Sequence, residues 1–524
     1  MRHALGAVAL VLVVATASAQ SAPDGPGWES PMSAGDRAYQ LGHYAEAESF
    51  FAAALERAER AGGARDPRVA LSLGLLASAY QAAGSFARAE PLLGRALGIA
   101  EGALGPDHPE VAATLTAVGG LATAQGRYAQ AEPLLRRALA IDERVLGPEH
   151  PEVAQTLQAL ASLERRQGRY ADAEMRSRRA LAIREKVLGP EHLDVATSLA
   201  GLAALYRPQS RYVETEQLAQ RALAIRESRL GPDHPDVIAP LVTLALIYGE
   251  QGRFARAEPL ARRALAVAEK TLGPEHPDVA TAIEPLAALA RERGRYAEAD
   301  ALGRRALAIR EKALGPEHPD VAAAVDGQAE LAILRRNAAQ AEVLARRALA
   351  VQEKALGPDH PDVARSLRVL GQAQAMQNRY PDAEPSFQRA LAIDEKRLGP
   401  ESPRVALDLD GLGTLHRRQG RLAQAEPLLH RAQAIAEKVF GPEHPQVAAS
   451  IVDLASLYRD QSHFSQAEPL YQWALTLQRK ALGPEHPDVA VSLEEYATLL
   501  RQTNREVEAG PLEAQARAIR ARTP

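Results

Sequence analysis

The 524-residue sequence contains no cysteine and few aromatic side chains. The absence of cysteine excludes disulfides, thiolate metal sites and lipid attachment to an N-terminal cysteine. Aromatic residues make up 4% of the chain, whereas the hydrophobic set makes up 46%. The apolar content is therefore mainly alanine, leucine and valine, which favours closely packed helices and predicts no strands.

Charge and catalytic motifs are also scarce. The formal net charge is -4, so the chain has no basic field that would favour nucleic acid. No P-loop, HExxH, GxSxG or GxGxxG pattern occurs. We therefore predict a protein that is not an enzyme and has no cofactor and no metal. An enzymatic role remains only as an accessory subunit of an enzyme complex.

The first residues have the layout of a secretory signal. Arg2 precedes an apolar run over residues 4–15, and the small residues Ala17 and Ala19 follow. This layout predicts cleavage after Ala19, a linker over residues 20–30 and a secreted or periplasmic product without a membrane span. The alternative is a retained anchor, which is disfavoured because the run is shorter than the about 20 residues that span a bilayer.

The rest of the chain is a repeat of 42 residues. The block LGPEHPDVA, or a near copy, recurs in one register without insertion or deletion. It begins at Leu104, Leu146, Leu188, Leu230, Leu272, Leu314, Leu356, Leu398, Phe440 and Leu482. Self-similarity at such a period is typical of stacked repeat architectures.

Each unit shows two helical stripes. In the unit 109–150, Val111, Leu115, Val118 and Ala122 lie on one face of a helix that ends near Gln125. The Gly-Arg-Tyr sequence at 126–128 interrupts the pattern. A second stripe follows, formed by Ala131, Leu134, Leu135, Ala138, Ile141 and Val145. We predict a helix–turn–helix unit.

Residues that commonly begin or end helices support these boundaries. Pro109 falls at the first position of the first helix, where the backbone N–H would have no partner within the helix, so proline sacrifices no hydrogen bond. Glu110 follows in the first turn, where the helix dipole favours a carboxylate. Gly147 and Pro148 end the second helix. Counted over residues 31–522, the pattern predicts an all-α, right-handed solenoid of about twelve helical hairpins, because one hairpin alone leaves apolar surface exposed.

The residues also carry a family likeness. Leu454, Ala455, Leu457, Tyr458, Gln461, Phe464, Ala467 and Glu468 follow a pattern that recurs through the array. This pattern resembles the tetratricopeptide (TPR) consensus, and the 42-residue period with its linker resembles the repeat of kinesin light chain. The resemblance implies a superhelix whose concave groove, lined by the first helices, binds a segment of a partner protein.

The resemblance does not carry over the specificity of kinesin light chain. In that family, paired asparagines early in the first helix hold the peptide backbone. The matching positions here, from Gly74-Leu75 to Glu494-Glu495, contain no asparagine. A motor-linked role is also implausible for an exported protein.

One position near the end of the first helix carries a row of arginines that the resemblance places in the groove. These are Arg165, Arg207, Arg291, Arg417, Arg459 and Arg501. Guanidinium groups could bind carboxylates of an acidic partner segment. The alternative is that each arginine pairs with an acid of its own or the next repeat, such as Asp460 or Glu292, which is the commoner situation at protein surfaces.

Three further periodic sets have local interpretations. The linker histidines, at His108, His150, His192, His234, His276, His318, His360, His444 and His486, are too far apart to share a zinc ion, since packed helices lie about 8–10 Å apart. We expect them to bond the backbone of their own turn.

The arginines at Arg95 and every 42 residues thereafter should form an outer surface whose positive charge is balanced by glutamates of the same helix. The glutamates equivalent to Glu90 should be first-turn acids of the second helix.

Departures from the consensus predict local irregularity. Pro240 and Pro285 fall inside first helices and should kink them. In the repeat that begins at Pro319, Arg336 replaces the turn glycine and Ala338 replaces the turn aromatic. We expect this repeat to open first.

The function that these patterns favour is a non-enzymatic scaffold or adaptor for envelope or extracellular proteins. The partners are expected to be proteins or peptides, some with acidic segments, and not nucleic acid. The alternative is a cytoplasmic or membrane-tethered adaptor, which follows if residues 1–19 are retained.

Overall fold

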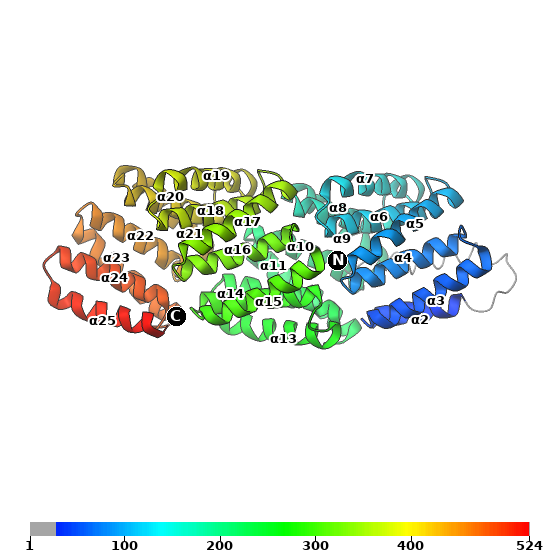
Figure 1. Ribbon diagram of the computed structural model, residues 1–524, viewed down its shortest axis with the longest axis horizontal. Helices are drawn as coiled ribbons and strands as arrows, with labels where there is room; N and C mark the ends of the chain where they lie inside the picture. The colour runs from blue at the N-terminus through cyan, green and yellow to red at the C-terminus, as the bar shows by residue number, and fades with distance from the viewer. Residues whose placement is uncertain (1–27, 523–524) are drawn as a thin grey trace. The chain divides into compact units, whose positions relative to one another are not determined.

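The computed structural model describes residues 28–522, which contain helices and no strand (Figure 1). Residues 1–19, the predicted signal, lie outside the described residues. Within them, no helix is long and apolar enough to cross a membrane. The predicted all-α class is confirmed.

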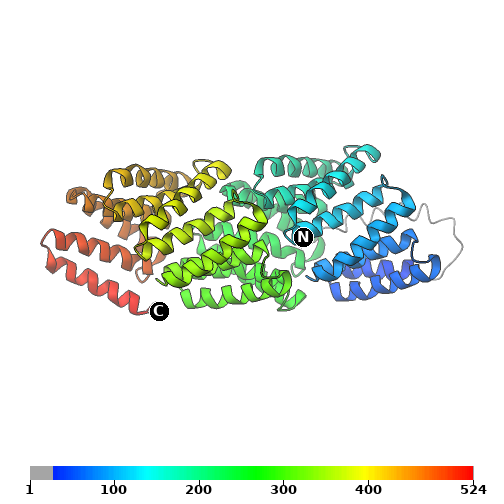
Figure 2. The ribbon, with the colours of Figure 1, turned by 45° about the horizontal axis from the view of Figure 1, so that its top comes forward.

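The helices alternate in twelve hairpins, which Figures 1 and 2 show as antiparallel pairs. The first helices are α2 (Glu29–Gln40), α4 (Pro67–Ala82), α6 (Pro109–Ala124), α8 (Pro151–Arg166), α10 (Leu193–Tyr206), α12 (Ile238–Glu250), α14 (Pro277–Glu292), α16 (Pro319–Leu334), α18 (Pro361–Met376), α20 (Pro403–Arg418), α22 (Pro445–Asp460) and α24 (Pro487–Gln502). The second helices are α3 (Tyr44–Gly62), α5 (Phe86–Leu104), α7 (Tyr128–Val145), α9 (Tyr170–Leu188), α11 (Tyr212–Leu230), α13 (Phe254–Leu272), α15 (Tyr296–Leu314), α17 (Ala338–Leu356), α19 (Tyr380–Leu398), α21 (Leu422–Phe440), α23 (Phe464–Leu482) and α25 (Glu506–Arg522).

The contacts divide the chain into two compact units. Unit 1 comprises the residues up to Leu244 with Leu260–Ala282 and Ile309–His318. Unit 2 comprises Ala245–Pro259, Ile283–Ala308 and the residues from Pro319 onward. Each unit is held together by apolar stripes at helical spacing, such as Ala131, Leu135 and Ala138 on α7, which are fully buried.

The histidine–proline linker starts each first helix. In α6, His108 is extended and its Nδ1 accepts the backbone N–H of Glu110 at 3.2 Å, so the imidazole is the N-cap and Pro109 is the first helical residue. Where Ser402 replaces histidine, its Oγ accepts the N–H of Arg404. This confirms a turn role, although the bonded N–H lies after the proline rather than before it.

Five linker histidines also make a contact that the sequence analysis missed. Their Nε2 atoms lie 2.7–3.0 Å from backbone carbonyls 194 residues earlier in the chain. In unit 1 the pairs are His234 with Gln40, His276 with Ala82 and His318 with Ala124; in unit 2 they are His444 with Glu250 and His486 with Glu292. We call these five the seam histidines.

The seam explains a glycine requirement. Each accepting carbonyl lies two residues before the positive-φ glycine that ends a first helix. At Gly42, Gly84, Gly252 and Gly294, the proline after the seam histidine lies within 4 Å of the position of a Cβ. A Cβ on Gly84 (φ +73°) would lie 2.6 Å from Cδ of Pro277, and one on Gly294 (φ +69°) would lie 2.5 Å from Cδ of Pro487. At these positions only glycine fits, for steric reasons as well as for its backbone conformation.

The predicted irregularities are partly present. A 3₁₀ turn, η2 (Pro235–Val237), precedes α12, so the α-helix begins at Ile238 and Pro240 lies in its first turn. Pro285, by contrast, lies inside α14, which runs unbroken from Pro277 to Glu292. Both helices are thus continuous through their prolines, and the kinks expected at Pro240 and Pro285 stay a prediction.

The hairpin of α16 and α17 is expected to exchange its amide hydrogens fastest. Arg336 adopts φ +57°, which costs a non-glycine residue about 1 kcal/mol, and Ala338 supplies no aromatic ring between the helices. Hydrogen exchange measured by mass spectrometry should show residues 322–350 less protected than residues 364–392 of the next hairpin. Equal protection of the two segments would contradict this expectation.

Candidate functional site

A cavity of about 360 Å³ lies along the first helices α4, α6, α8 and α10 of unit 1. Small side chains dominate its wall, among them Gly74, Ala117, Gly120 and Ala159. Glycine and alanine recur there because first helices pack closely and project little into the hollow. The volume falls within the range of sites that bind ligands, about 300–1,000 Å³.

Two glutamine amides in the wall have unused hydrogen-bonding capacity. Nε2 of Gln81 and Oε1 of Gln158 are buried and have no partner among the described residues. Gly201 makes room for the second amide, because a Cβ there would lie 2.5 Å from Nε2 of Gln158. Unpaired buried polar atoms are costly, so the wall is suited to a ligand that offers both donors and acceptors.

A buried hydrogen-bonded chain supports the wall at Thr116. The hydroxyls of Thr116 and Thr156 lie 3.1 Å apart, and Thr156 donates to Oδ2 of Asp142 at 2.8 Å. Burial raises the pKa of Asp142 to about 6, although the Thr156 hydrogen bond opposes this shift. The carboxyl group is therefore a pH-dependent element of unit 1.

Replacing Asp142 by asparagine is expected to remove a pH-dependent destabilisation. Because the native pKa exceeds the usual value, the native state binds more protons, and stability falls as pH rises from about 4 to about 6 and stays reduced above it. Between these pH values the free energy of unfolding of the wild type should fall by about 2 kcal/mol because of Asp142. Urea unfolding of the wild type and Asp142→Asn at pH 4.5 and pH 7.5 should show the variant gaining at the higher pH, whereas the exposed-site control Asp107→Asn should not.

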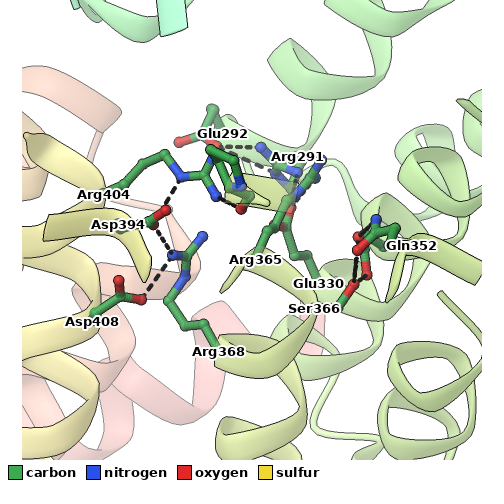
Figure 3. A network of polar contacts seen from close by, with 12 residues as sticks. Arg291, Glu292, Glu330, Gln352, Arg365, Ser366, Arg368, Asp394, Arg404 and Asp408 are labelled. Carbon is green, nitrogen blue, oxygen red and sulfur yellow. Dashed lines mark hydrogen bonds and ion pairs between the residues drawn. The ribbon is translucent and has the colours of Figure 1, made fainter. Parts of the chain in front are cut away.

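The first helices of unit 2 are charged where those of unit 1 are not. Between their first and last turns, α4, α6, α8 and α10 carry no charged residue, whereas α16, α18, α20, α22 and α24 all do. Figure 3 shows part of the resulting network. Arg365 binds both carboxylate oxygens of Glu330, at 2.7 and 2.9 Å, and Arg291 binds the same carboxylate at 2.8 Å.

The network contains strongly perturbed acids. Burial would raise the pKa of Glu330, but Arg365 and Arg291 outweigh it and hold that pKa well below its usual range. Burial raises the pKa of Asp326 to about 7; its carboxyl group accepts bonds from Ser366 and Gln352. In the same view Arg368 lies between Asp394 and Asp408 (Figure 3).

The structure places the predicted arginine row in two settings. Arg165 lines the unit 1 cavity, and Arg207 is the C-cap residue that follows α10. In unit 2 the other four members form ion pairs, as the alternative interpretation predicted. Their partners are Glu330 and Glu292 for Arg291, Asp460 for Arg417, Asp460 and Glu495 for Arg459, and Glu513 for Arg501.

The outer arginine series has different partners from those predicted. Arg137 binds Glu101 of the preceding hairpin at 2.7 Å and the carbonyl of Pro106, instead of a glutamate on its own helix. The same pairing recurs for Arg179 with Glu143 and Arg221 with Glu185. The Glu90 series likewise pairs across repeats, as between Glu132 and Arg169. Both series therefore link neighbouring hairpins.

Comparison with known proteins agrees with this architecture. The family model described as tetratricopeptide repeat matches residues 34–102, 69–144, 110–186, 159–207, 194–270, 242–312, 278–350, 322–396 and 404–480. No protein of curated function matches the sequence.

Several solved structures are similar to parts of the chain. A putative kinesin light chain with nearly identical TPR-like repeats from Podosopora anserina is 28% identical, with a TM-score of 0.32 over 39% of this chain and 97% of that one. BtubC (BKLC) from P. vanneervenii is 24% identical, with a TM-score of 0.35 over 44% and 92%. A Rap protein complexed with competence and sporulation factor is 13% identical, with a TM-score of 0.54 over 71% and 99%. Since the family model matches most of the sequence, the chain belongs to the tetratricopeptide repeat family.

Proposed function

We propose that this protein is a non-enzymatic scaffold that binds an extended segment of a partner protein in the unit 1 cavity. The observation that carries the proposal is the continuous cavity along four consecutive first helices. With helices about 8–10 Å apart, it offers roughly 25–30 Å of wall, enough for about eight extended residues. The unpaired amides of Gln81 and Gln158 favour a ligand with a peptide backbone.

An acidic segment is the partner chemistry that the arginine row favours. In unit 1, Arg165 lies in the cavity wall and brings positive charge to the end of α8. A carboxylate of the partner placed there would bind a planar fork of donors. The wider proposal, that the row as a whole contacts the partner, includes Arg207, Arg291, Arg417, Arg459 and Arg501.

Site-specific crosslinking tests the proposed cavity. A photoreactive side chain at Ala117, in the wall, should capture a partner from envelope extract, whereas one at Val213, which is 65% exposed on α11, should not. The large side chain of Ala159→Trp should block capture by filling the cavity. Equal capture at both positions, or capture that survives Ala159→Trp, would overturn the proposal.

We also propose that the protein acts outside the cytoplasm, on the strength of the N-terminal sequence pattern. N-terminal sequencing of the product recovered from periplasm or medium should begin at Gln20. Recovery of a product that retains residues 1–19, in the cytoplasm or at a membrane, would favour the alternative adaptor.

A further inference from the structure

A seam histidine holds one of the helices that line the unit 1 cavity. Nε2 of His276 lies 2.7 Å from the carbonyl oxygen of Ala82, the last residue of α4. Gln81, the residue before Ala82, belongs to the cavity wall, as do Gly74 and Ser78 of the same helix. The bond that His276 makes therefore acts on the end of a helix that forms the wall.

Both bonds of the His276 ring require one protonation state. Nδ1 accepts the backbone N–H of Asp278 at 3.1 Å, which caps the start of α14, so this nitrogen carries no proton. Nε2 faces a carbonyl oxygen, which only accepts, so this nitrogen must donate its proton. The ring is therefore neutral, because an imidazolium ion has two donors and no acceptor.

The position of the ring opposes a positive charge. The side chain of His276 is 7% exposed, and it lies at the start of α14, where the helix dipole is positive. The carboxylate of Asp278 lies 4.0 Å from Nδ1, beyond hydrogen-bond distance. Glu275, the acid that precedes the ring in the sequence, is bound by Lys312 at 2.9 Å. A proton on Nδ1 therefore removes a helix cap, and the ring gains a bond to Asp278 only after it turns.

The elements on either side of the ring have their charges paired elsewhere. In α4, residues 69–82 include no charged side chain, and the hydroxyl of Tyr80 accepts a hydrogen bond from Arg88 at 2.6 Å. The last charged residue of α13, Lys270, binds Asp233 at 2.7 Å. The protonation of the ring therefore depends on its own two bonds and on the acid two residues after it.

A seam histidine of unit 2 shows the effect of a similar environment. Nε2 of His444 lies 3.0 Å from the carbonyl oxygen of Glu250, and its Nδ1 accepts the N–H of Gln446. Burial lowers the pKa of His444, although the bond to Glu250 and the charge of Glu292 oppose this shift. Burial in the seam thus disfavours the charged ring even with a carboxylate nearby.

We propose that His276 is a proton-sensitive clasp on α4, which releases the wall of the unit 1 cavity when the imidazole becomes charged. The proton is taken up at Nδ1, which then loses the N–H of Asp278 and turns towards the carboxylate of that residue. This rotation carries Nε2 away from the carbonyl of Ala82, so α4 loses the bond at its end. The clasp is a regulation of the proposed function and rests on it, because release of the wall should weaken partner binding in the cavity.

Linkage between protonation and opening fixes the direction of the response. The closed clasp requires a neutral ring, whereas an exposed imidazole takes up a proton with a pKa of about 6.5. The open state therefore binds more protons, so opening increases as the pH falls below about 6.5. Asp142 titrates in the same range with the opposite effect on the stability of unit 1, so the response must be measured locally at α4.

Hydrogen exchange of the full-length protein at pH 7.5 and pH 5.5 tests the clasp, with exchange times scaled for the slower chemical exchange in acid. The amides of residues 79–85, at the end of α4, should be about fivefold less protected at pH 5.5. In His276→Ser their protection should be low at both pH values, because serine caps the helix, as Ser402 does, but has no group that reaches the carbonyl of Ala82. The matched control is His150→Ser, since His150 caps α8 in the same way and no carbonyl lies 194 residues before it. This variant should keep the wild-type response.

Equal protection of residues 79–85 at the two pH values in the wild type, or a pH response that survives His276→Ser, would overturn the clasp. Crosslinking at Ala117 tests its effect on the cavity: capture should fall at pH 5.5 in the wild type and be independent of pH in His276→Ser. Capture that does not change with pH while the exchange does would overturn the link to the cavity. Absence of capture at both pH values would instead count against the proposed function, and the exchange result would still decide the clasp.

Discussion

Gly294→Ala is expected to lower the free energy of unfolding of unit 2 by about 3 kcal/mol. About 1 kcal/mol comes from placing a Cβ at φ +69°. The remainder comes from the contact between that Cβ and Cδ of Pro487, 2.5 Å away, because a proline ring cannot turn aside and overpacking costs about 1–3 kcal/mol. The clash should also pull His486 away from the carbonyl of Glu292.

Gly420 is the matched control for this prediction. It also ends a first helix with positive φ, +75°, but nothing lies within 4 Å of the position of its Cβ. Gly420→Ala should therefore cost only about 1 kcal/mol. Urea unfolding followed by circular dichroism, with hydrogen exchange of residues 283–308 and 487–502, measures the difference. Similar losses for the two variants would show that conformation alone, and not the seam, requires glycine at position 294.

The seam marks the boundary of what the sequence could predict. The spacing of apolar residues, proline and glycine sets each hairpin through contacts within about 40 residues, so the helices begin and end close to the predicted positions. The bond between His276 and the carbonyl of Ala82 depends on how far successive hairpins rotate. No pattern inside one repeat contains that rotation.

A comparison among repeats could nevertheless have given a hint of the seam. The ends of first helices carry glycine at Gly42, Gly84, Gly252 and Gly294, where a later proline packs or approaches. In the last five repeats they carry Arg336, Asn378, Gly420, Ser462 and Asn504. The conformation is left-handed in both sets, so the turn alone does not require glycine, and at Gly42, Gly84 and Gly294 the neighbouring proline leaves no room for a Cβ. For the arginine row, the alternative interpretation did predict acids of the same or the next repeat as partners, and Glu292 and Asp460 are among those that the structure shows.

Buried polar residues distinguish repeats that are otherwise nearly identical. At one inward position of the second helix, Asp142 bonds Thr156, Arg184 bonds Ser198, Gln352 bonds Ser366 and Gln478 bonds Ser492. Each partner lies 14 residues later, on the next first helix. Because apolar surfaces of similar shape would pack in more than one order, these pairs favour the correct neighbour.

Arg368→Leu is expected to lower the free energy of unfolding of unit 2 by about 3–5 kcal/mol, because it removes one partner of a buried ion pair. Arg368 is 7% exposed and donates to Oδ1 of Asp408 at 3.0 Å, and its guanidinium lies 3.8 Å from Asp394. Both acids are fully buried. Arg404 still compensates Asp394 at 3.1 Å in the variant, whereas Asp408 is left without a cation.

The pH dependence of this loss identifies its cause. Burial raises the pKa of Asp408 to about 7 even beside Arg368, so the pKa should be higher still in Arg368→Leu. A raised carboxyl pKa destabilises the native state as pH rises, since the unfolded chain then binds fewer protons. The loss measured by urea unfolding should therefore be smaller at pH 5 than at pH 8.

A second substitution at the acid should restore the stability of Arg368→Leu. The double variant Arg368→Leu/Asp408→Leu removes the uncompensated charge, and replacement of a buried ion pair by apolar residues is often close to neutral. The outer-surface control Arg389→Ala, which breaks an ion pair of partly exposed groups with Glu353, should cost at most about 1 kcal/mol. If the double variant is as unstable as Arg368→Leu at both pH values, the loss arises from packing around Arg368 and not from the stranded carboxylate.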